Sequence, residues 1–208
     1  LILGILSTAE GVTTPRQREL GVAVVNIGAT ATTLVVEEEG DVVHLAAIPI
    51  GAEHITSDIA IGLRISLDQA EQLKLAIGTA MPREFKKQDE VELGAIIAGE
   101  EGTVSRRYLA EIVEARTEEI FERIDRELTA AGRSGSLPAG VVLVGGGAKL
   151  PGIVEVAKRK LRLPVVIGKP LGVDSVVERA FDPAFAPVVG LVIWGIALGN
   201  DRGSTGRF

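Results

Sequence analysis

The pattern of apolar residues predicts buried strands in two separate parts of the chain. Residues 21–28 and Val141–Val144 are near-continuous apolar runs, as expected for strands that are covered on both faces. After the first run, Leu34–Val36 and Val42–Ile50 are further strand candidates, separated by the charged turn at 37–41. Three consecutive strands joined by short turns predict an antiparallel meander.

A helical period replaces this pattern elsewhere, with apolar residues recurring every three or four positions. Such periodicity covers residues 52–63, 66–77, 105–131 and 153–161. Ser66 with Gln69 has capping-box spacing, and Ser105 is a good N-cap. The last of these helices lies between the strand at 141–144 and a short strand at 164–167, so it completes a β-α-β unit with parallel strands and a right-handed crossover.

Weaker patterns give the remaining expectations. Residues 1–6 read as the end of a strand whose partners are missing, 7–20 as a polar connection, and 91–98 as a strand. Residues 188–198 are apolar on nearly every side but too short to span a bilayer, so we expect a buried core helix. The only methionine is Met81, and we therefore expect the chain to begin inside a larger protein.

Composition removes several classes of function. The net charge is −6 without a basic run, which argues against nucleic acid as the main partner. The chain has no cysteine, and its two histidines, His44 and His54, lack zinc-site spacing. It also lacks a Walker A sequence, a nucleophile elbow and a zinc helix motif, so common hydrolase and metalloenzyme chemistries have little support.

Two turns of small residues are the candidate site. Gly28–Thr33 and Gly145–Ala148 each follow a buried strand, and glycine lets a ligand approach the backbone closely. Both strands can end at one edge of the sheet, where open α/β sheets bind ligands. Together the turns would form a phosphate grip and a floor for a base or ribose. The alternative is that both are tight turns of a structural domain, and the pattern alone does not decide.

Longer motifs resemble one known family. Residues 24–28 with the Thr-rich turn resemble the second phosphate loop of the superfamily of actin, heat-shock chaperones and sugar kinases, and 141–147 resemble its adenosine motif. Residues 48–64, continuing through 70–74, are very similar to the bacterial cell-division protein FtsA, an actin-like anchor for the tubulin-like protein FtsZ. The ending at 182–195 is also similar, so the resemblance covers essentially the whole chain.

The resemblance implies an α/β fold, namely an actin-like (RNase H-like) mixed sheet with a small inserted α+β subdomain. Residues 21–51 and 105–199 would form the sheet-bearing subdomain and 52–104 the inserted one. Residues 1–20 would be the end of a missing N-terminal lobe with its connection, and 200–208 a tail. We expect the family's amphipathic membrane-tethering helix to lie outside residues 200–208, because this tail lacks an amphipathic pattern.

The resemblance also implies nucleotide-contacting residues. One set would contact the adenosine and α-phosphate: Gly145, Gly146, Gly147 and Ala148. A second set would contact the ribose and base: Glu71 and Lys74. A third set would lie at the β- and γ-phosphates: Asn26, Gly28, Thr30 and Thr32. The alternative for the Glu–Lys pair is an ordinary exposed helix pair.

The phosphate loop departs from the family pattern, in which an acidic residue precedes Ile-Gly-Gly-Gly-Thr-Thr-Asp. Position 26 is Asn, positions 29 and 31 are Ala, and position 33 is Thr. A neutral Asn is a poorer partner for Mg²⁺ than the usual Asp. We therefore expect ATP binding with weak or absent hydrolysis and weakened use of Mg²⁺.

The implied function is an actin-like, ATP-binding scaffold of septum formation that anchors FtsZ filaments at the cytoplasmic face of the membrane. The FtsZ C-terminal tail would dock on residues 52–104, and the protein would self-associate into filaments. Membrane contact would come only through segments outside this chain. Two alternatives remain open: a PilM-like protein of type IV pilus assembly, and an ATP-dependent kinase or chaperone of the same superfamily.

Overall fold

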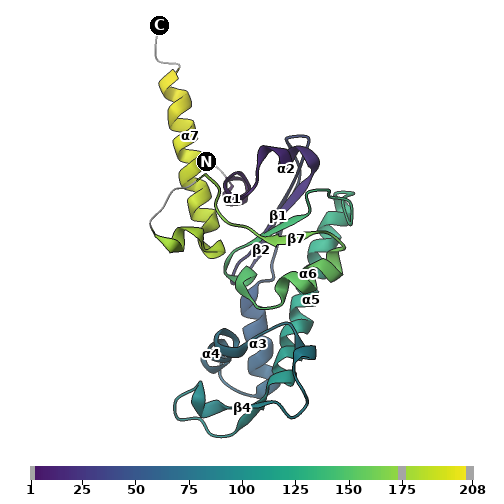
Figure 1. Ribbon diagram of the computed structural model, residues 1–208, viewed down its shortest axis with the longest axis vertical. Coiled ribbons are helices and arrows are strands. Elements are labelled where there is room, and N and C mark those ends of the chain that lie inside the picture. Colours follow the sequence, from purple (N-terminus) through teal and green to yellow (C-terminus); the bar gives the residue numbers. More distant parts are fainter. Residues whose placement is uncertain (1–2, 173–176, 205–208) are drawn as a thin grey trace.

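A five-stranded mixed sheet forms the centre of the molecule (Figure 1). The computed structural model describes residues 3–172 and 177–204, with side chains up to residue 196. The sheet has the order β3-β2-β1-β6-β7, in which β1 is antiparallel to β2 and parallel to β6. Its strands are β1 (Val22–Ile27), β2 (Thr32–Glu38), β3 (Asp41–Ile48), β6 (Val141–Val144) and β7 (Val165–Ile167). The meander and the β-α-β unit are both confirmed.

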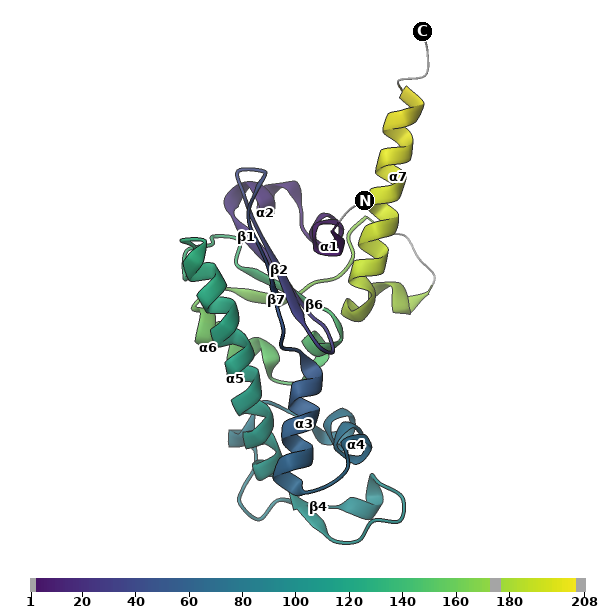
Figure 2. The same ribbon diagram turned by 180° about the vertical axis from the view of Figure 1, so that it is seen from behind.

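Helices cover both faces of this sheet, as Figure 2 shows. Side chains alternate between the faces along each strand. On β1, Val25 packs with helices α5 and α6, whereas Val24 packs with α1. The α-helices are α1 (Gly4–Val12), α2 (Pro15–Leu20), α3 (Ala52–Leu63), α4 (Leu67–Ile77), α5 (Arg106–Ala130), α6 (Ile153–Leu161) and α7 (Ala186–Ser204). Burial on both faces explains the near-continuous apolar sequence of β1 and β6.

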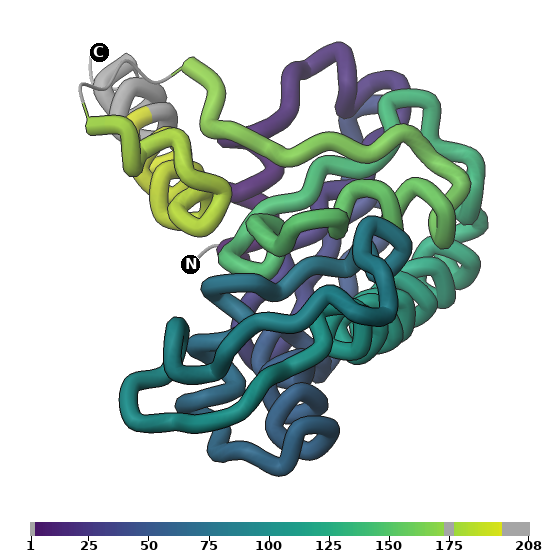
Figure 3. The backbone as a smooth tube through the Cα atoms, turned by 60° about the horizontal axis from the view of Figure 1, so that its bottom comes forward, coloured from purple at the N-terminus to yellow at the C-terminus, as the bar shows by residue number. Residues whose placement is uncertain are grey.

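The inserted part lies at one end of the sheet and is brought forward in Figure 3. It contains α3, α4 and a two-stranded sheet of β4 (Glu90–Glu92) and β5 (Thr103–Ser105). Ser66 and Gln69 form the expected capping box at the start of α4. Helix α5 packs on α3 and on α6, so it belongs to both parts and the core runs continuously between them.

The prediction for residues 3–20 was wrong, and residues 1 and 2 lie outside the described part of the chain. Instead of a strand end and a polar connection, the structure has helices α1 and α2. The Ser7 and Thr8 hydroxyls both donate to the Gly4 carbonyl, which satisfies them within α1. Thr14 caps α2 in a capping box with Gln17. Tertiary packing of α1 on the sheet and on α7 decides its conformation.

The strand expected at 91–98 is much shorter. Strand β4 ends at Glu92, and the 3₁₀ turn η2 (Leu93–Ala95) follows it. The Leu93 amide donates to the Gly102 carbonyl, and the Ile97 amide turns back to the Leu93 carbonyl. The chain therefore curls at a point where the apolar run alone suggested an extended strand.

Helix α7 is longer and far less buried than predicted. Four of its large apolar side chains are between 43% and 61% exposed, namely Val188, Leu191, Val192 and Ile196. Its packed face crosses α1 with the two backbones close together, since a Cβ on Gly11 would lie 2.9 Å from the Gly190 Cα. An all-apolar pattern could not show that only one face is covered. No helix within the described residues has the length and apolarity needed to cross a bilayer.

Candidate functional site

A cleft of about 660 Å³ lies where the carboxyl ends of β1 and β6 meet the inserted helices. The turn after β1, the loop after β6, the start of α3 and one face of α4 all contribute to its walls. Its lining residues are Gly28, Ala29, Ala52, Glu53, Ile55, Thr56, Ser57, Leu67, Asp68, Glu71, Lys74, Leu75, Gly146, Gly147, Lys149, Leu150 and Pro151. The structure thus brings the two small-residue turns together, as the sequence predicted.

The turn after β1 is closed by one hydrogen bond of its own and by two from the start of α3. The Gly28 amide donates to the Ala31 carbonyl at 2.9 Å. The Gly28 carbonyl accepts from the Ala52 amide, and the Ala29 carbonyl accepts from the Glu53 amide, both at 2.9 Å. These two donors are the first amides of α3, which a helix normally leaves free. The turn therefore uses the groups that would otherwise bind an anion at this helix end.

The loop after β6 forms the short 3₁₀ helix η3 (Gly146–Lys149). Gly145 has φ +89°, and a Cβ there would collide with the Asn26 side chain. A Cβ on Gly147 would collide with Ile27 Cγ2. Packing against β1 thus explains both glycines. Gly146 differs, because it is exposed and a Cβ there would meet nothing within 4 Å.

Two contacts tie this loop to the segment before α7. The Gly145 amide donates to the Pro183 carbonyl at 2.8 Å, and Lys149 Nζ lies 2.6 Å from Asp182 Oδ2. Asp182 also accepts from the Ala184 amide through Oδ1. Hydrogen bonds from Lys149 and Ala184 hold the pKa of Asp182 below its usual range. The loop is consequently held between β1 on one side and residues 182–184 on the other.

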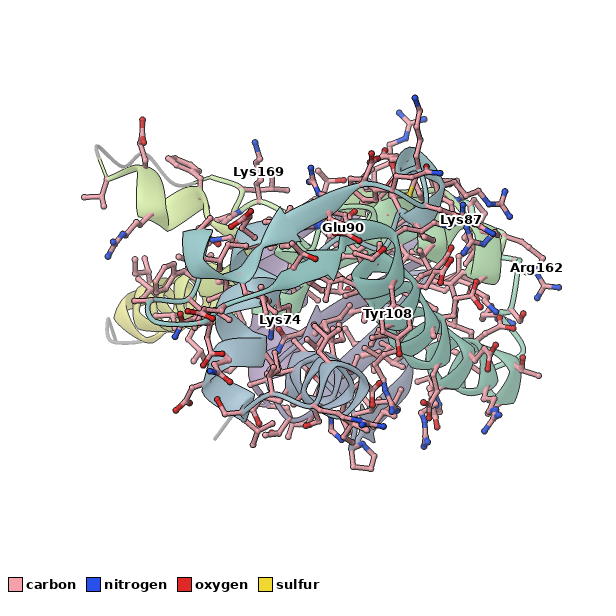
Figure 4. The ribbon with its side chains drawn as sticks, turned by 90° about the horizontal axis from the view of Figure 1, so that it is seen from below. Lys74, Lys87, Glu90, Tyr108, Arg162 and Lys169 are labelled. Atoms are coloured by element: carbon pink, nitrogen blue, oxygen red, sulfur yellow. The ribbon has the colours of Figure 1, made fainter. Side chains whose placement is uncertain are left out.

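Glu71 and Lys74 form an ion pair on α4, with Lys74 Nζ 2.6 Å from Glu71 Oε2. Lys74, labelled in Figure 4, lies between α3 and α4 and also donates to Thr56 Oγ1 and the Ala52 carbonyl. Partial burial alone would raise the pKa of Glu71, but the hydrogen bonds from Lys74 and Thr56 outweigh it and lower that pKa. Glu71 is therefore a carboxylate held in one place at the cleft wall.

The predicted residues divide into those that line the cleft and those that do not. The lining set is Gly28, Glu71, Lys74, Gly146 and Gly147. The other set is Asn26, Thr30, Thr32, Gly145 and Ala148. Thr32 is fully buried and donates to the Ile50 carbonyl at 2.8 Å, so its hydroxyl has a structural role. Asn26 is half-buried beside Gly145.

Three carboxylates line the cleft, those of Glu53, Asp68 and Glu71. Across the described residues, no group of three or more His, Asp or Glu side chains is placed to hold a metal. Asn26 supplies a neutral amide where the family pattern has a carboxylate.

Sequence reasoning missed the contribution of α3 and the apolar side of α4. Thr56 and Glu53 on α3 line the cleft, as do Leu67 and Leu75 on α4. Leu67 and Leu75 are 59% and 76% exposed, which is unusual for leucines on an otherwise packed helix. A signal was present, since Leu67, Glu71 and Leu75 recur every four residues on one helical face.

Solved structures define the class of this fold. A crystal structure of MreB5 of Spiroplasma citri bound to ADP matches 97% of the chain and 61% of that protein, with a TM-score of 0.74 at 19% identity. A PilM–PilN type IV pilus biogenesis complex matches 93% of the chain and 50% of that protein, with a TM-score of 0.64 at 20% identity. At this identity the likeness concerns the fold alone. The protein has an actin-like fold.

Sequence comparisons then identify the family. The family model described as "Cell division protein FtsA" matches residues 23–190. Proteins of that name are 33% identical over 201 residues in Pseudomonas aeruginosa and 38% identical over 181 residues in Rhizobium meliloti. These matches cover 97% and 85% of the chain, but only 48% and 40% of those relatives. The chain belongs to the FtsA family of cell division proteins and spans about half the length of these relatives or less.

Proposed function

We propose that this chain forms one side of an ATP-binding cleft in an actin-like cell-division scaffold. The observation that carries the proposal is Gly146. The fold requires neither a positive φ nor close packing at this position, yet it is a glycine that faces the cleft. Packing against β1 explains the neighbouring Gly145 and Gly147 but not Gly146. A glycine that packing does not explain is expected where a ligand lies against the backbone.

Other residues of the cleft suit the parts of a nucleotide. Leu67 and Leu75 offer an apolar surface for a base, and the Glu71 carboxylate can accept hydrogen bonds from sugar hydroxyls. The phosphate end would lie toward the turn at Gly28. Because that turn uses the first amides of α3, the exposed backbone beyond Gly28 would have to supply the phosphate contacts.

Isothermal titration of the full-length protein with ATP tests this proposal, with Gly146→Val as the test variant and Gly195→Ala as the control. Gly195 is exposed on α7, a Cβ there would meet nothing within 4 Å, and it lies outside the cleft lining. Saturable ATP binding that Gly146→Val weakens and the control retains is the expected result. Equal binding by all three proteins would contradict the proposal.

Hydrolysis is expected to be weak or absent. The amide of Asn26 replaces the carboxylate that would hold Mg²⁺ through water, and the described residues offer no cluster of carboxylates in its place. Phosphate release by the full-length protein should therefore show no Mg²⁺-dependent turnover above that of an Asn26→Ala variant. Clear turnover above that control would contradict weak hydrolysis without affecting ATP binding.

Docking of the FtsZ tail on residues 52–104 is the second part of the proposal. The inserted part, seen from below in Figure 4, carries exposed Lys87 and Glu90. Ile61 is 76% exposed there, and Tyr108 at the start of α5 is 47% exposed. Apolar and aromatic anchors surrounded by charges are typical of peptide-binding surfaces.

The docking test measures binding of an FtsZ C-terminal peptide to the full-length protein by fluorescence anisotropy. Removing both anchors with Ile61→Ser and Tyr108→Ser should abolish binding, and replacing residues 79–104 by a short linker should weaken it, while ATP binding is retained. Unchanged peptide affinity in that folded variant would exclude docking through this segment. A pilus-protein N-terminal peptide serves as the competitor: preference for it would favour the PilM-like alternative.

Self-association and location complete the proposed role. The actin-like fold and family membership support filament formation by the full-length protein at the cytoplasmic face of the division site. Sedimentation with and without ATP tests the first property. Imaging of a fluorescent fusion in dividing cells tests the second.

A further inference from the structure

The outer strand β3 carries three apolar side chains that remain exposed. Val42, Val43 and Leu45 are 46%, 41% and 39% exposed. Helix α1 packs on β1 and β2, on the face of the sheet to which Val35 points. Leu45 lies opposite Val35 in the ladder, so it belongs to the same face, one strand farther out. We call these three residues of β3 the edge stripe.

Strand β3 also has a free backbone edge, because it is the last strand of the sheet. Such an edge presents unpaired N–H and C=O groups along its length. Strand β3 contains neither lysine nor proline, two residues that often protect an edge from pairing. In the ladder, Val36 pairs with His44 and Glu37 pairs with Val42, so Val43 is an extra residue in a β-bulge. The edge is therefore apolar and able to accept another strand.

A buried carboxylate lies directly beside the edge stripe. Glu37, opposite Val42 in the ladder, is 8% exposed, and its Oε2 has no hydrogen-bond partner among the described residues. Arg18 is nearby, but its guanidinium donates to the Thr13 carbonyl and to Glu10 Oε1. Burial raises the pKa of Glu37, and Arg18 offsets this only in part. A buried carboxylate oxygen without a donor is costly, so it is a point at which a donor from a partner would be favourable.

The turn between β2 and β3 adds negative charge at the same end of the edge. Glu39 and Asp41 are both exposed there. Glu38 forms an ion pair with Arg133, so that cation is already used within the chain. The chemistry that complements this edge is consequently a row of aliphatic side chains that ends in a lysine or an arginine.

We propose that the free edge of β3 docks an extended peptide segment of a partner protein, which adds a strand to the sheet and places a lysine or arginine beside Glu37. Alternate side chains of the segment would pack on the edge stripe, and backbone hydrogen bonds to β3 would hold it. In the antiparallel direction the basic residue belongs near the C-terminal end of the segment, because Asp41 begins β3. The site lies outside the cleft and the inserted part, so it does not depend on the proposed function.

The probe is a capped peptide of alternating valine and threonine that ends in a pair of lysines, and the control peptide ends in a pair of glutamates. Fluorescence anisotropy of both labelled peptides is measured with the full-length protein at low salt. The lysine peptide should bind saturably and about tenfold more tightly than the glutamate peptide. Amides of β3 should become protected from hydrogen exchange when it binds. No binding, or equal binding of the two peptides, would overturn the proposal.

Leu45→Thr tests the edge stripe, because threonine suits a strand but buries less apolar surface. The affinity for the lysine peptide should fall about three- to tenfold. Val166→Thr is the matched control, since Val166 is 54% exposed on β7 at the opposite edge of the sheet, and it should leave the affinity unchanged. Equal affinities of the two variants would show that the peptide does not lie on the edge stripe, which overturns the proposed site.

Glu37→Gln keeps the shape of the side chain and removes its charge. It should reduce the preference for the lysine peptide over the glutamate peptide several-fold, as expected when a hydrogen bond to a charged group is lost. In the native protein, the ¹³C shift of the Glu37 carboxyl should titrate at a lower pH when the lysine peptide is bound, because a nearby cation favours the ionised form. An unchanged preference or an unchanged titration would overturn the role of Glu37.

Two further outcomes would assign the edge to another occupant. If the amides of β3 are already protected in the full-length protein and no peptide binds, another part of the same chain covers the edge. If Leu45→Thr abolishes a concentration-dependent dimer in sedimentation, the occupant is a second copy of the protein. Either result would overturn docking of a partner peptide.

Discussion

The two turns that meet in the cleft look alike in sequence but are built differently. The turn at Gly28 is closed by the start of α3, because its carbonyls accept from the first two amides of that helix and Gly51 packs directly against it. The loop at Gly145–Gly147 is held from outside, by β1 and by the segment at 182–183, and leaves Gly146 open. Small residues therefore allow close packing in the first turn. In the second loop, Gly146 faces the cleft, and a Cβ there would meet no protein atom within 4 Å.

The largest effect on stability should come from adding a methyl group at Gly51, which packs against the turn at Gly28. A Cβ on Gly51 would lie 2.6 Å from the Gly28 carbonyl oxygen and closer still to that of Ala29. Gly51→Ala should therefore lower the free energy of unfolding by about 2–3 kcal/mol, because neither backbone can retreat without loss of the α3 contacts. Chemical denaturation measures this change. Gly195→Ala is the opposite case, since an exposed helical glycine replaced by alanine should gain about 1 kcal/mol.

Substitution in the loop at Gly145–Gly147 should change ATP affinity and not the stability of the fold. Gly146→Val should weaken ATP binding by at least about tenfold, equivalent to about 1.4 kcal/mol, while the unfolding midpoint stays close to native. A Cβ at this position meets no protein atom within 4 Å, so we expect the substitution to act on the ligand and not on the fold. If the variant instead unfolds like Gly51→Ala, the two turns do not differ as described.

The cleft wall should show a small dependence on pH. The pKa of Glu71 is lowered in the folded state, so its stabilisation is present above about pH 4.5 and is lost as the pH falls through the folded value. The side chain is 41% exposed, and solvent screening limits the contribution to less than about 1 kcal/mol. Unfolding free energies at pH 6 and pH 3 should therefore differ less in Glu71→Gln than in the native protein. Equal pH dependence would show that the ion pair adds nothing.

The smallest effect should come from the ion pair between Lys149 and Asp182, which joins the loop at Gly145–Gly147 to the segment before α7. Lys149 and Asp182 are 53% and 25% exposed, and exposed ion pairs contribute little. Lys149→Met should change the free energy of unfolding by less than about 0.5 kcal/mol, and added salt should remove the difference. Asp182→Ala should cost more, because it also removes the acceptor for the Ala184 amide.

Local signals in the sequence predicted the elements that position the cleft. Helix α3 has the expected bounds, and the cap at Ser66 and the stop at Gly78 place α4. The two turns were found because each interrupts an apolar run with small residues. The turn at Gly28 could not be recognised as closed, since its partners are the amides of Ala52 and Glu53 at the far end of the meander.

Tertiary contacts explain the remaining errors. Thr56 carried no signal, because its role depends on α3 and α4 lying side by side. The capping box of Thr14 with Gln17 is a local signal for α2, whereas the polar composition of residues 7–20 predicts only a connection. In α7, apolar residues on all sides concealed which face packs on α1, and the contact at Gly190 decides this.

The parallel pairing of β1 with β6 also affects the order in which the protein folds. Strand β1 ends at Ile27, whereas β6 begins only at Val141, with the meander, the inserted part and α5 between them. Contacts so distant in sequence form late, because a long segment must be ordered before they can close. During synthesis the turn at Gly28 can fold with the meander, while the second loop does not yet exist. A ligand that requires both loops can therefore bind only after nearly the whole sheet has assembled, and it would stabilise the last step of folding.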